Sequence, residues 1–187
     1  MLHKRRRRTE GPIDTLINAV HSGDIDAIIC ARSNASRLEG LSVEDLVLDR
    51  MKLFVNVAHP LASEKEIDAR RVLDFPIILP PGSSATRDAL DNAFLEAAGR
   101  KPSGTVETSS YAVIKRLLLA SQHISFRSVK EFREDFDAGV IKSLDLGFEF
   151  DDRAICILQR SSAIQTPATS KVINLIRCAA RDAREFG

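Results

Sequence analysis

The chain has 187 residues, of which 44% are hydrophobic and 28% are charged, so it can bury a core like an ordinary globular protein. Its apolar runs are too short to cross a bilayer, and no apolar segment follows the basic start, so neither a membrane span nor a secretory signal is expected. Removing the five basic residues 4–8 leaves 22 Lys and Arg against 26 Asp and Glu, a net charge of −4, which argues against a surface that binds nucleic-acid phosphates.

Apolar residues recur at helical spacing in six segments, taken here in chain order. Glycine follows two of them, Gly23 and Gly99, where a left-handed helix end is expected. The predicted helices cover residues 13–22, 67–73, 87–98, 111–120 and 129–136, and the last begins near Pro167.

Short apolar runs between these helices predict strands, and residues 31–42 are expected to form a linker because they carry no periodicity. The predicted strands cover residues 25–30, 46–58 with a turn near 48–50, 75–79, the neighbourhood of Val106, 124–126, 140–146 and 153–159. Strands that alternate with helices in this way indicate an α/β architecture with largely parallel sheets.

No catalytic or metal-binding pattern stands out. Gly82-Ser83-Ser84 does not satisfy the G-x-S-x-G pattern of a nucleophile elbow, and the chain has no phosphate loop and no GxGxxG. The four histidines lack cysteine or carboxylate neighbours at metal-ligand spacing, and His59 is interpreted as a turn residue. We therefore expect neither an enzyme, nor a metal site, nor a cofactor.

The chain has three cysteines, Cys30, Cys156 and Cys178. Their number is odd, their spacing is wide and no CxxC pattern occurs, so they are expected to be free thiols in a reducing compartment.

Two helix starts rich in hydroxyl groups, residues 83–86 and 108–110, each follow a predicted strand. In open α/β sheets, ligands bind beyond the carboxyl ends of the strands, where the first turns of helices present free N–H groups that favour anions. These hydroxyls indicate a site for a small anion. They are equally typical of helix caps, and the sequence leaves both interpretations open.

Four motifs follow one another along the chain: Gly23-Asp24-Ile25-Asp26-Ala27-Ile28-Ile29, the His-Pro-Leu-Ala turn at residues 59–62, Gly82-Ser83 with Arg87, and Asp135 with Gly139, Ile141 and Leu144. In this order they resemble the C-terminal effector-binding (substrate-binding) domain of LysR-type transcriptional regulators. The resemblance covers roughly residues 10–180. It implies a fragment truncated at its N-terminus, without the family's DNA-binding domain and linker helix.

The resemblance implies a two-lobe α/β fold of the periplasmic-binding-protein-like type 2, with the first strand-helix unit of lobe one missing and one sheet edge left uncovered. Lobe one would comprise residues 10–72 and 150–187, and lobe two residues 73–149. Residues 1–9 would be a disordered basic leader, which is more typical of a solvated tail than of a nucleic-acid grip.

The resemblance also places an effector in a cleft between the lobes. The cleft residues would be Gly11, Pro12, Ile13, Ala31, Arg32, Ser83, Ser84, Thr108, Ser109, Ile124, Ser125 and Phe126. The expected function is that of a cytoplasmic ligand-sensing domain that binds a small anionic metabolite and modulates transcription. It would form a homo-oligomer or pair with a related regulator, and alone it would make neither specific DNA contacts nor membrane contacts. The alternative is a stand-alone solute-binding or interaction module, a non-DNA-binding remnant that pairs with related regulators.

Overall fold

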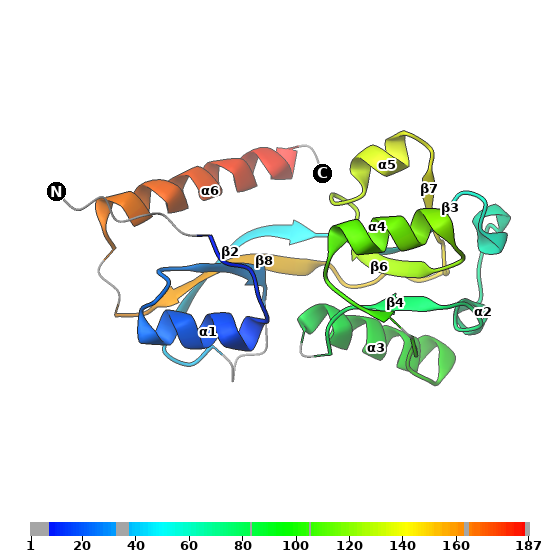
Figure 1. Cartoon of the computed structure of the whole chain (residues 1–187), viewed down its shortest axis with the longest axis horizontal. Helices are drawn as coiled ribbons and strands as arrows, with labels where there is room; N and C mark the ends of the chain where they lie inside the picture. The colour runs from blue at the N-terminus through cyan, green and yellow to red at the C-terminus, as the bar shows by residue number, and fades with distance from the viewer. Residues whose placement is uncertain (1–7, 33–37, 83, 105, 163–164, 186–187) are drawn as a thin grey trace.

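The computed structural model describes residues 8–32, 38–82, 84–104, 106–162 and 165–185. The expectation of a disordered leader falls mainly on residues 1–7, which lie outside the described residues. The described residues form two separate sheets, one of three strands and one of five. Figure 1 shows the two sheets side by side, each with its own helices. We call them, with these helices, the small unit and the large unit.

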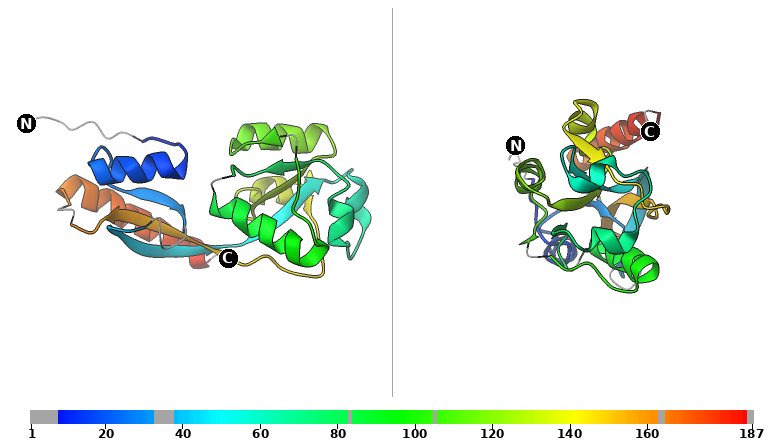
Figure 2. Two further views of the ribbon diagram at one scale, coloured as in Figure 1. Left: turned by 90° about the horizontal axis from the view of Figure 1, so that it is seen from below. Right: turned by 90° about the vertical axis from the view of Figure 1, so that its right-hand side faces the viewer.

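The small unit contains the sheet β1-β8-β2, in which both pairings are antiparallel. Its strands are β1 (Ile28–Ala31), β2 (Leu41–Asp49) and β8 (Arg153–Arg160). Helices α1 (Ile13–Ser22) and α6 (Pro167–Glu185) cover its opposite faces (Figure 2). The central strand β8 supplies both cores, because Leu158 packs with α1 while Ile157 packs with Ile173 of α6.

Helix α1 occupies the predicted residues 13–22. Gly23 adopts a left-handed conformation, with φ of 84°, and its backbone N–H bonds to the carbonyl oxygens of Ala19 and Val20. A side chain at Gly23 would carry the steric penalty of that conformation, so glycine ends the helix here as the sequence predicts.

The large unit contains the sheet β5-β4-β6-β3-β7. Its strands are β3 (Met51–Asn56), β4 (Ile77–Leu79), β5 (Val106–Glu107), β6 (Ile124–Ser128) and β7 (Ile141–Ser143). Its helices are η2 (Pro60–Ser63), α2 (Ala69–Val72), α3 (Ala85–Ala98), α4 (Tyr111–Ala120) and α5 (Arg133–Asp137). Figure 2 shows α3 and α4 on opposite faces of this sheet.

Each face of the large sheet has its own apolar core. Leu90 and Phe94 of α3 pack on one face, and Ile114 and Leu118 of α4 pack on the other. Strand residues alternate between the faces, so neighbouring positions on one strand face different helices.

The expectation of largely parallel sheets is wrong. Among the described strands, β4 runs parallel to β5 and β6, whereas β3 is antiparallel to β6 and β7, and the small sheet is antiparallel throughout. The reason is the chain path. Strand β2 continues into β3 across the single residue Arg50, and the chain returns to the small unit as β8, so both sheets receive strands of opposite direction (Figure 1).

The division between the units differs from the expected lobe boundary at residue 72. Residues 51–72 lie with the large unit, because Leu53 of β3, Leu61 of η2 and Val72 of α2 are buried in its core. The expected linker 31–42 also differs, since β2 already begins at Leu41.

Candidate ligand site

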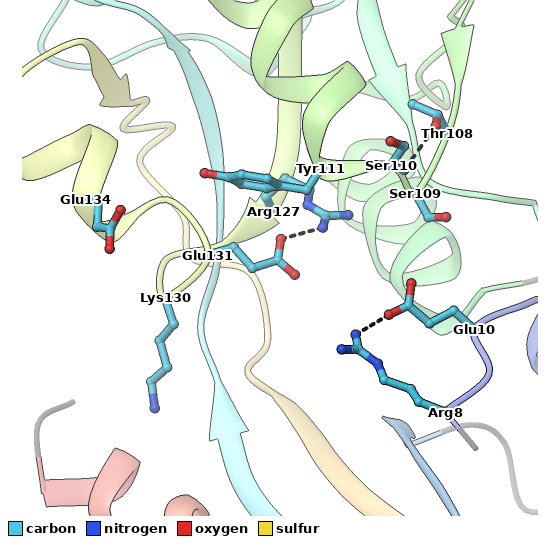
Figure 3. A pocket seen from close by; sticks show the side chains of 10 residues that line it. All are labelled: Arg8, Glu10, Thr108, Ser109, Ser110, Tyr111, Arg127, Lys130, Glu131 and Glu134. Atoms are coloured by element: carbon cyan, nitrogen blue, oxygen red, sulfur yellow. Dashed lines mark hydrogen bonds and ion pairs between the residues drawn. The ribbon is translucent and has the colours of Figure 1, made fainter. Parts of the chain in front are cut away.

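A cavity of about 890 Å³ lies between the segment that precedes α1 and the large unit (Figure 3). Its volume falls in the range of small-molecule sites, roughly 300–1,000 Å³. The lining residues are Arg8, Glu10, Thr108, Ser109, Ser110, Tyr111, Arg127, Lys130, Glu131 and Glu134. Arg8 and Glu10 precede α1 and line the cavity from the side of the small unit. The other eight residues belong to the large unit, where they lie in the turn before α4, at the start of α4, in β6 and in the segment that leads from β6 into the start of α5.

The start of α4 is open toward this cavity. Its N-cap, Ser110, makes no side-chain capping hydrogen bond within the described part of the chain, and the first turn carries no acidic residue. Thr108 holds the turn in place, because its backbone N–H donates to the carbonyl of Leu79 and its Oγ1 accepts from the Ser110 N–H at 3.1 Å. The free N–H groups and dipole of the helix therefore favour a negatively charged group at this end of the cavity.

Arg127 brings a cation to the cavity from β6. Its side chain is 17% exposed, and Nη2 donates to the Glu131 carboxylate at 2.5 Å. The buried Nε has no hydrogen-bond partner among the described residues, nor has the buried Oγ of Ser125 two positions earlier on the same face of β6. A buried polar atom without a partner costs stability, so the Arg127 Nε has an unsatisfied hydrogen bond near the cavity wall.

Tyr111 is fixed at the cavity wall by α5. Its hydroxyl donates to Asp135 at 3.0 Å, and its ring packs against Phe132 with centroids 5.4 Å apart. Lys115 binds the other oxygen of Asp135 at 2.8 Å, and this hydrogen bond is the main reason that the pKa of Asp135 is lowered. Burial, followed by the hydrogen bond to Asp135, raises the pKa of Tyr111, so the phenol stays protonated and neutral.

Of the predicted cleft residues, the structure places Thr108 and Ser109 in this cavity. Ser84 is instead a helix cap, because its Oγ donates to the Pro81 carbonyl at 2.7 Å and accepts from the Arg87 N–H at 3.2 Å. Ser83 lies outside the described residues.

The remaining predicted residues do not line the cavity. Gly11, Pro12 and Ile13 lead into α1, where Ile13 packs against the core of the small unit. Ala31 ends β1, and Arg32 forms an ion pair with Asp45 at 2.5 Å.

The β6 residues Ile124 and Phe126 face the core beneath α3, and Ser125 is buried on the opposite face. Sequence reasoning missed Arg127, although the alternation of a strand could have found it. If Phe126 faces a core, the next residue faces the other way.

Two negative observations apply to the described parts of the chain. Within these residues no cluster of three or more His, Cys, Asp or Glu side chains could hold a metal ion. Among the helices that the structure describes, none has the length and apolar character needed to span a membrane.

Residues 7–181 match the family described as the LysR substrate binding domain. The chain belongs to this family. LysR regulatory domains are non-enzymatic, which agrees with the expectation from the sequence.

Among curated relatives, the chain is 29% identical over 168 residues to the HTH-type transcriptional regulator GalR of Pseudomonas putida, covering 90% of this chain and 42% of that protein. It is 28% identical over 181 residues to the uncharacterized HTH-type transcriptional regulator YdcI of Escherichia coli, covering 94% and 58%. The chain thus spans about half the length of these relatives.

Solved LysR effector domains share the fold. The effector binding domain of QuiR in complex with shikimate has a TM-score of 0.75 at 18% identity, covering 92% of this chain and 79% of that one. The Synechocystis PCC6803 CcmR regulatory domain in complex with 2-PG has a TM-score of 0.74 at 17% identity, covering 89% and 79%. The chain therefore has the periplasmic-binding-protein-like fold of LysR effector-binding domains, as the resemblance implied.

Proposed function

We propose that this chain is the ligand-sensing part of a cytoplasmic LysR-type transcription regulator, and that it binds a small anionic metabolite between two lobes. The observation that carries this proposal is the cavity of about 890 Å³, because its wall combines the open start of α4 with the Arg127 guanidinium. A helix start and a guanidinium are two donors of the kind that bind carboxylates and phosphates.

The charges around the cavity narrow the class of ligand. Three basic residues, Arg8, Arg127 and Lys130, stand with three acidic ones, Glu10, Glu131 and Glu134. A purely anionic ligand would meet repulsion from the carboxylates, whereas hydroxyl groups on the ligand can donate to them. We therefore infer a hydroxylated carboxylic or phosphorylated acid whose anionic group lies at α4. The shikimate bound by QuiR is an acid of this kind, and CcmR binds 2-PG, also an acid.

A ligand in this position would contact residues from both units, Arg8 and Glu10 on one side and the α4 turn on the other. Such a ligand favours the relative orientation of the units in which both sets of contacts form. In a longer regulator, this orientation would set how the DNA-binding parts meet an operator. The chain alone would make no specific DNA contact, and self-association or pairing with a related regulator would carry the signal.

Titration calorimetry against a panel of hydroxylated carboxylates and phosphorylated acids, with shikimate and 2-PG included, tests the proposal. Thr108→Ala and Arg127→Gln should each lower the affinity for a panel ligand by about tenfold, which corresponds to about 1.4 kcal/mol of binding free energy. Ser121→Ala is the matched control, because this hydroxyl stands at the opposite end of α4 and donates to the Leu117 carbonyl.

The control should bind like the unchanged protein, and thermal unfolding should verify that each variant is folded. Binding that ignores both Thr108→Ala and Arg127→Gln, or a panel that yields no heat at all, would contradict the proposed site.

A further inference from the structure

Two cysteines far apart in the sequence meet across the small sheet. Cys30 of β1 lies directly opposite Cys156 of β8 in the antiparallel register. Opposed residues of an antiparallel pair point to the same face of the sheet, and both cysteines contact the core beneath α1. Opposed Cα atoms in such a pair lie about 4.5–5.5 Å apart, inside the range of about 4.4–6.8 Å that a disulfide spans.

The two thiols interact with each other. The hydrogen bond between them is the main cause of both pKa shifts, because it raises the pKa of Cys30 and lowers that of Cys156. Burial acts in the same direction on both thiols and raises the pKa of each. The pair therefore titrates as a unit in which one thiol stabilises the thiolate of the other. Two nearby charges act on Cys156 in opposite directions, since Asp45 raises its pKa and Arg32 lowers it.

Access to the pair is one-sided. Cys156 is completely buried, whereas Cys30 is half-buried on β1, which is an edge strand of the sheet. A small oxidant can therefore reach the Cys30 sulfur from solvent, and the Cys156 thiol lies buried next to Cys30. The third cysteine, Cys178, is exposed on α6, away from this register.

We propose that Cys30 and Cys156 form a redox-active dithiol, which a peroxide converts into an intramolecular disulfide. The proton in the hydrogen bond between the two sulfurs passes from Cys30 to the Cys156 thiolate, so that the accessible Cys30 sulfur becomes the nucleophile. Cys30 attacks the peroxide, takes one oxygen as a sulfenic acid and releases hydroxide, or an alkoxide from an organic peroxide. The neighbouring thiol then displaces that oxygen as water, and the S–S bond forms. In sum, two thiols and one hydrogen peroxide give one disulfide and two waters.

The cross-link would join the edge strand β1 covalently to the central strand β8 and would close the chain from Ala31 to Ile155 into a loop. Closing a long loop lowers the entropy of the unfolded chain, so the oxidised protein should melt at a higher temperature. The disulfide would also fix the end of β1, next to Arg32, and the strand that returns from the large unit.

The test uses the full chain with Cys178→Ser, so that the exposed thiol cannot form links between molecules. After hydrogen peroxide and alkylation of the remaining thiols, intact mass should fall by two hydrogens relative to the reduced protein, with no alkyl group added. Non-reducing peptide mapping should join the peptides that carry Cys30 and Cys156, and dithiothreitol should separate them. Thiols that remain open to alkylation in the unfolded protein, or sulfurs that gain oxygen without a link, would overturn the proposal.

A second variant tests whether the disulfide is the cause of a rise in melting temperature after peroxide treatment. In Cys30→Ser with Cys178→Ser, the half-buried thiol is replaced by a group of similar size that cannot form a disulfide. Peroxide should then leave the melting temperature unchanged, whereas it should raise that of the protein with the intact pair. An equal rise in both proteins would overturn the disulfide as its cause.

Discussion

Asp49, the last residue of β2, and Arg153, the first residue of β8, form a two-pronged ion pair at the point where the chain crosses between the units. The Arg153 Nε and Nη2 atoms lie 2.9 and 2.8 Å from the same carboxylate oxygen. Ser128 donates to the other oxygen of Asp49, and Arg153 donates to Thr86 at 2.6 Å. One buried carboxylate thus joins both crossing strands to β6 and, through Arg153, to the start of α3.

We expect Asp49→Ala to lower the free energy of unfolding by about 3–5 kcal/mol, because it leaves the Arg153 guanidinium, 23% exposed, without its charge partner. Asp137→Ala is the control, since it breaks an exposed pair with Arg133 and should cost less than about 1 kcal/mol. Urea unfolding monitored by circular dichroism measures both. Equal losses in the two variants would contradict a structural role for the crossing pair.

Acid should destabilise the protein through His59. This ring is buried, its Nδ1 accepts from the Leu61 N–H at 3.1 Å, and burial lowers its pKa below the ordinary 6.5. The unfolded chain therefore takes up a proton before the folded chain does, so stability falls as the pH drops through about 6.5 and levels off below the folded pKa. The free energy of unfolding should fall less between about pH 7.5 and about pH 5.5 in His59→Asn than in the unchanged protein. Asparagine can still cap η2, so this variant keeps the cap while removing the titrating ring. An equal loss in both proteins would exclude His59 as the source.

Gly104 should tolerate no side chain. An added Cβ would lie 2.1 Å from the carbonyl oxygen of Ile77, a backbone atom of β4 that cannot move aside alone. Gly104→Ala should therefore cost about 1–3 kcal/mol in thermal or urea unfolding. Gly11→Ala is the matched control, because a methyl group there meets nothing within 4 Å in the described structure. Equal free energies of unfolding for the two variants would contradict the steric clash predicted at residue 104.

Ser84→Ala should separate helix capping from ligand binding. Loss of the bond from the Arg87 N–H should lower the free energy of unfolding by about 1 kcal/mol. Because Ser84 does not line the cavity, ligand affinity in calorimetry should stay unchanged. A loss of affinity like that expected for Thr108→Ala would mean that the ligand also reaches α3.

Local signals predicted the elements well. Helix α4 covers the predicted residues 111–120, and Gly99 ends α3 in a left-handed conformation. His59 is a turn residue, as interpreted from the sequence, because its ring caps η2. Spacing and capping are properties of a few neighbouring residues, so a single sequence contains them.

Strand direction and sheet membership could not be predicted in the same way. Apolar alternation marks β3 as a strand, but its antiparallel pairing with β6 depends on where the chain crosses between the units. The same limit applies to the site. Thr108 and Ser109 carry a local signal, whereas Arg8 and Arg127 meet the cavity only through the three-dimensional path of the chain. The contact of Cys30 with Cys156 is likewise a matter of register.

The most direct test of the account is the crystal structure of this chain with the ligand that binds most tightly in the calorimetric panel. We predict electron density for its anionic group at the first turn of α4, within hydrogen-bond distance of Arg127. Density for the ligand elsewhere on the protein, with this cavity filled by solvent alone, would contradict it.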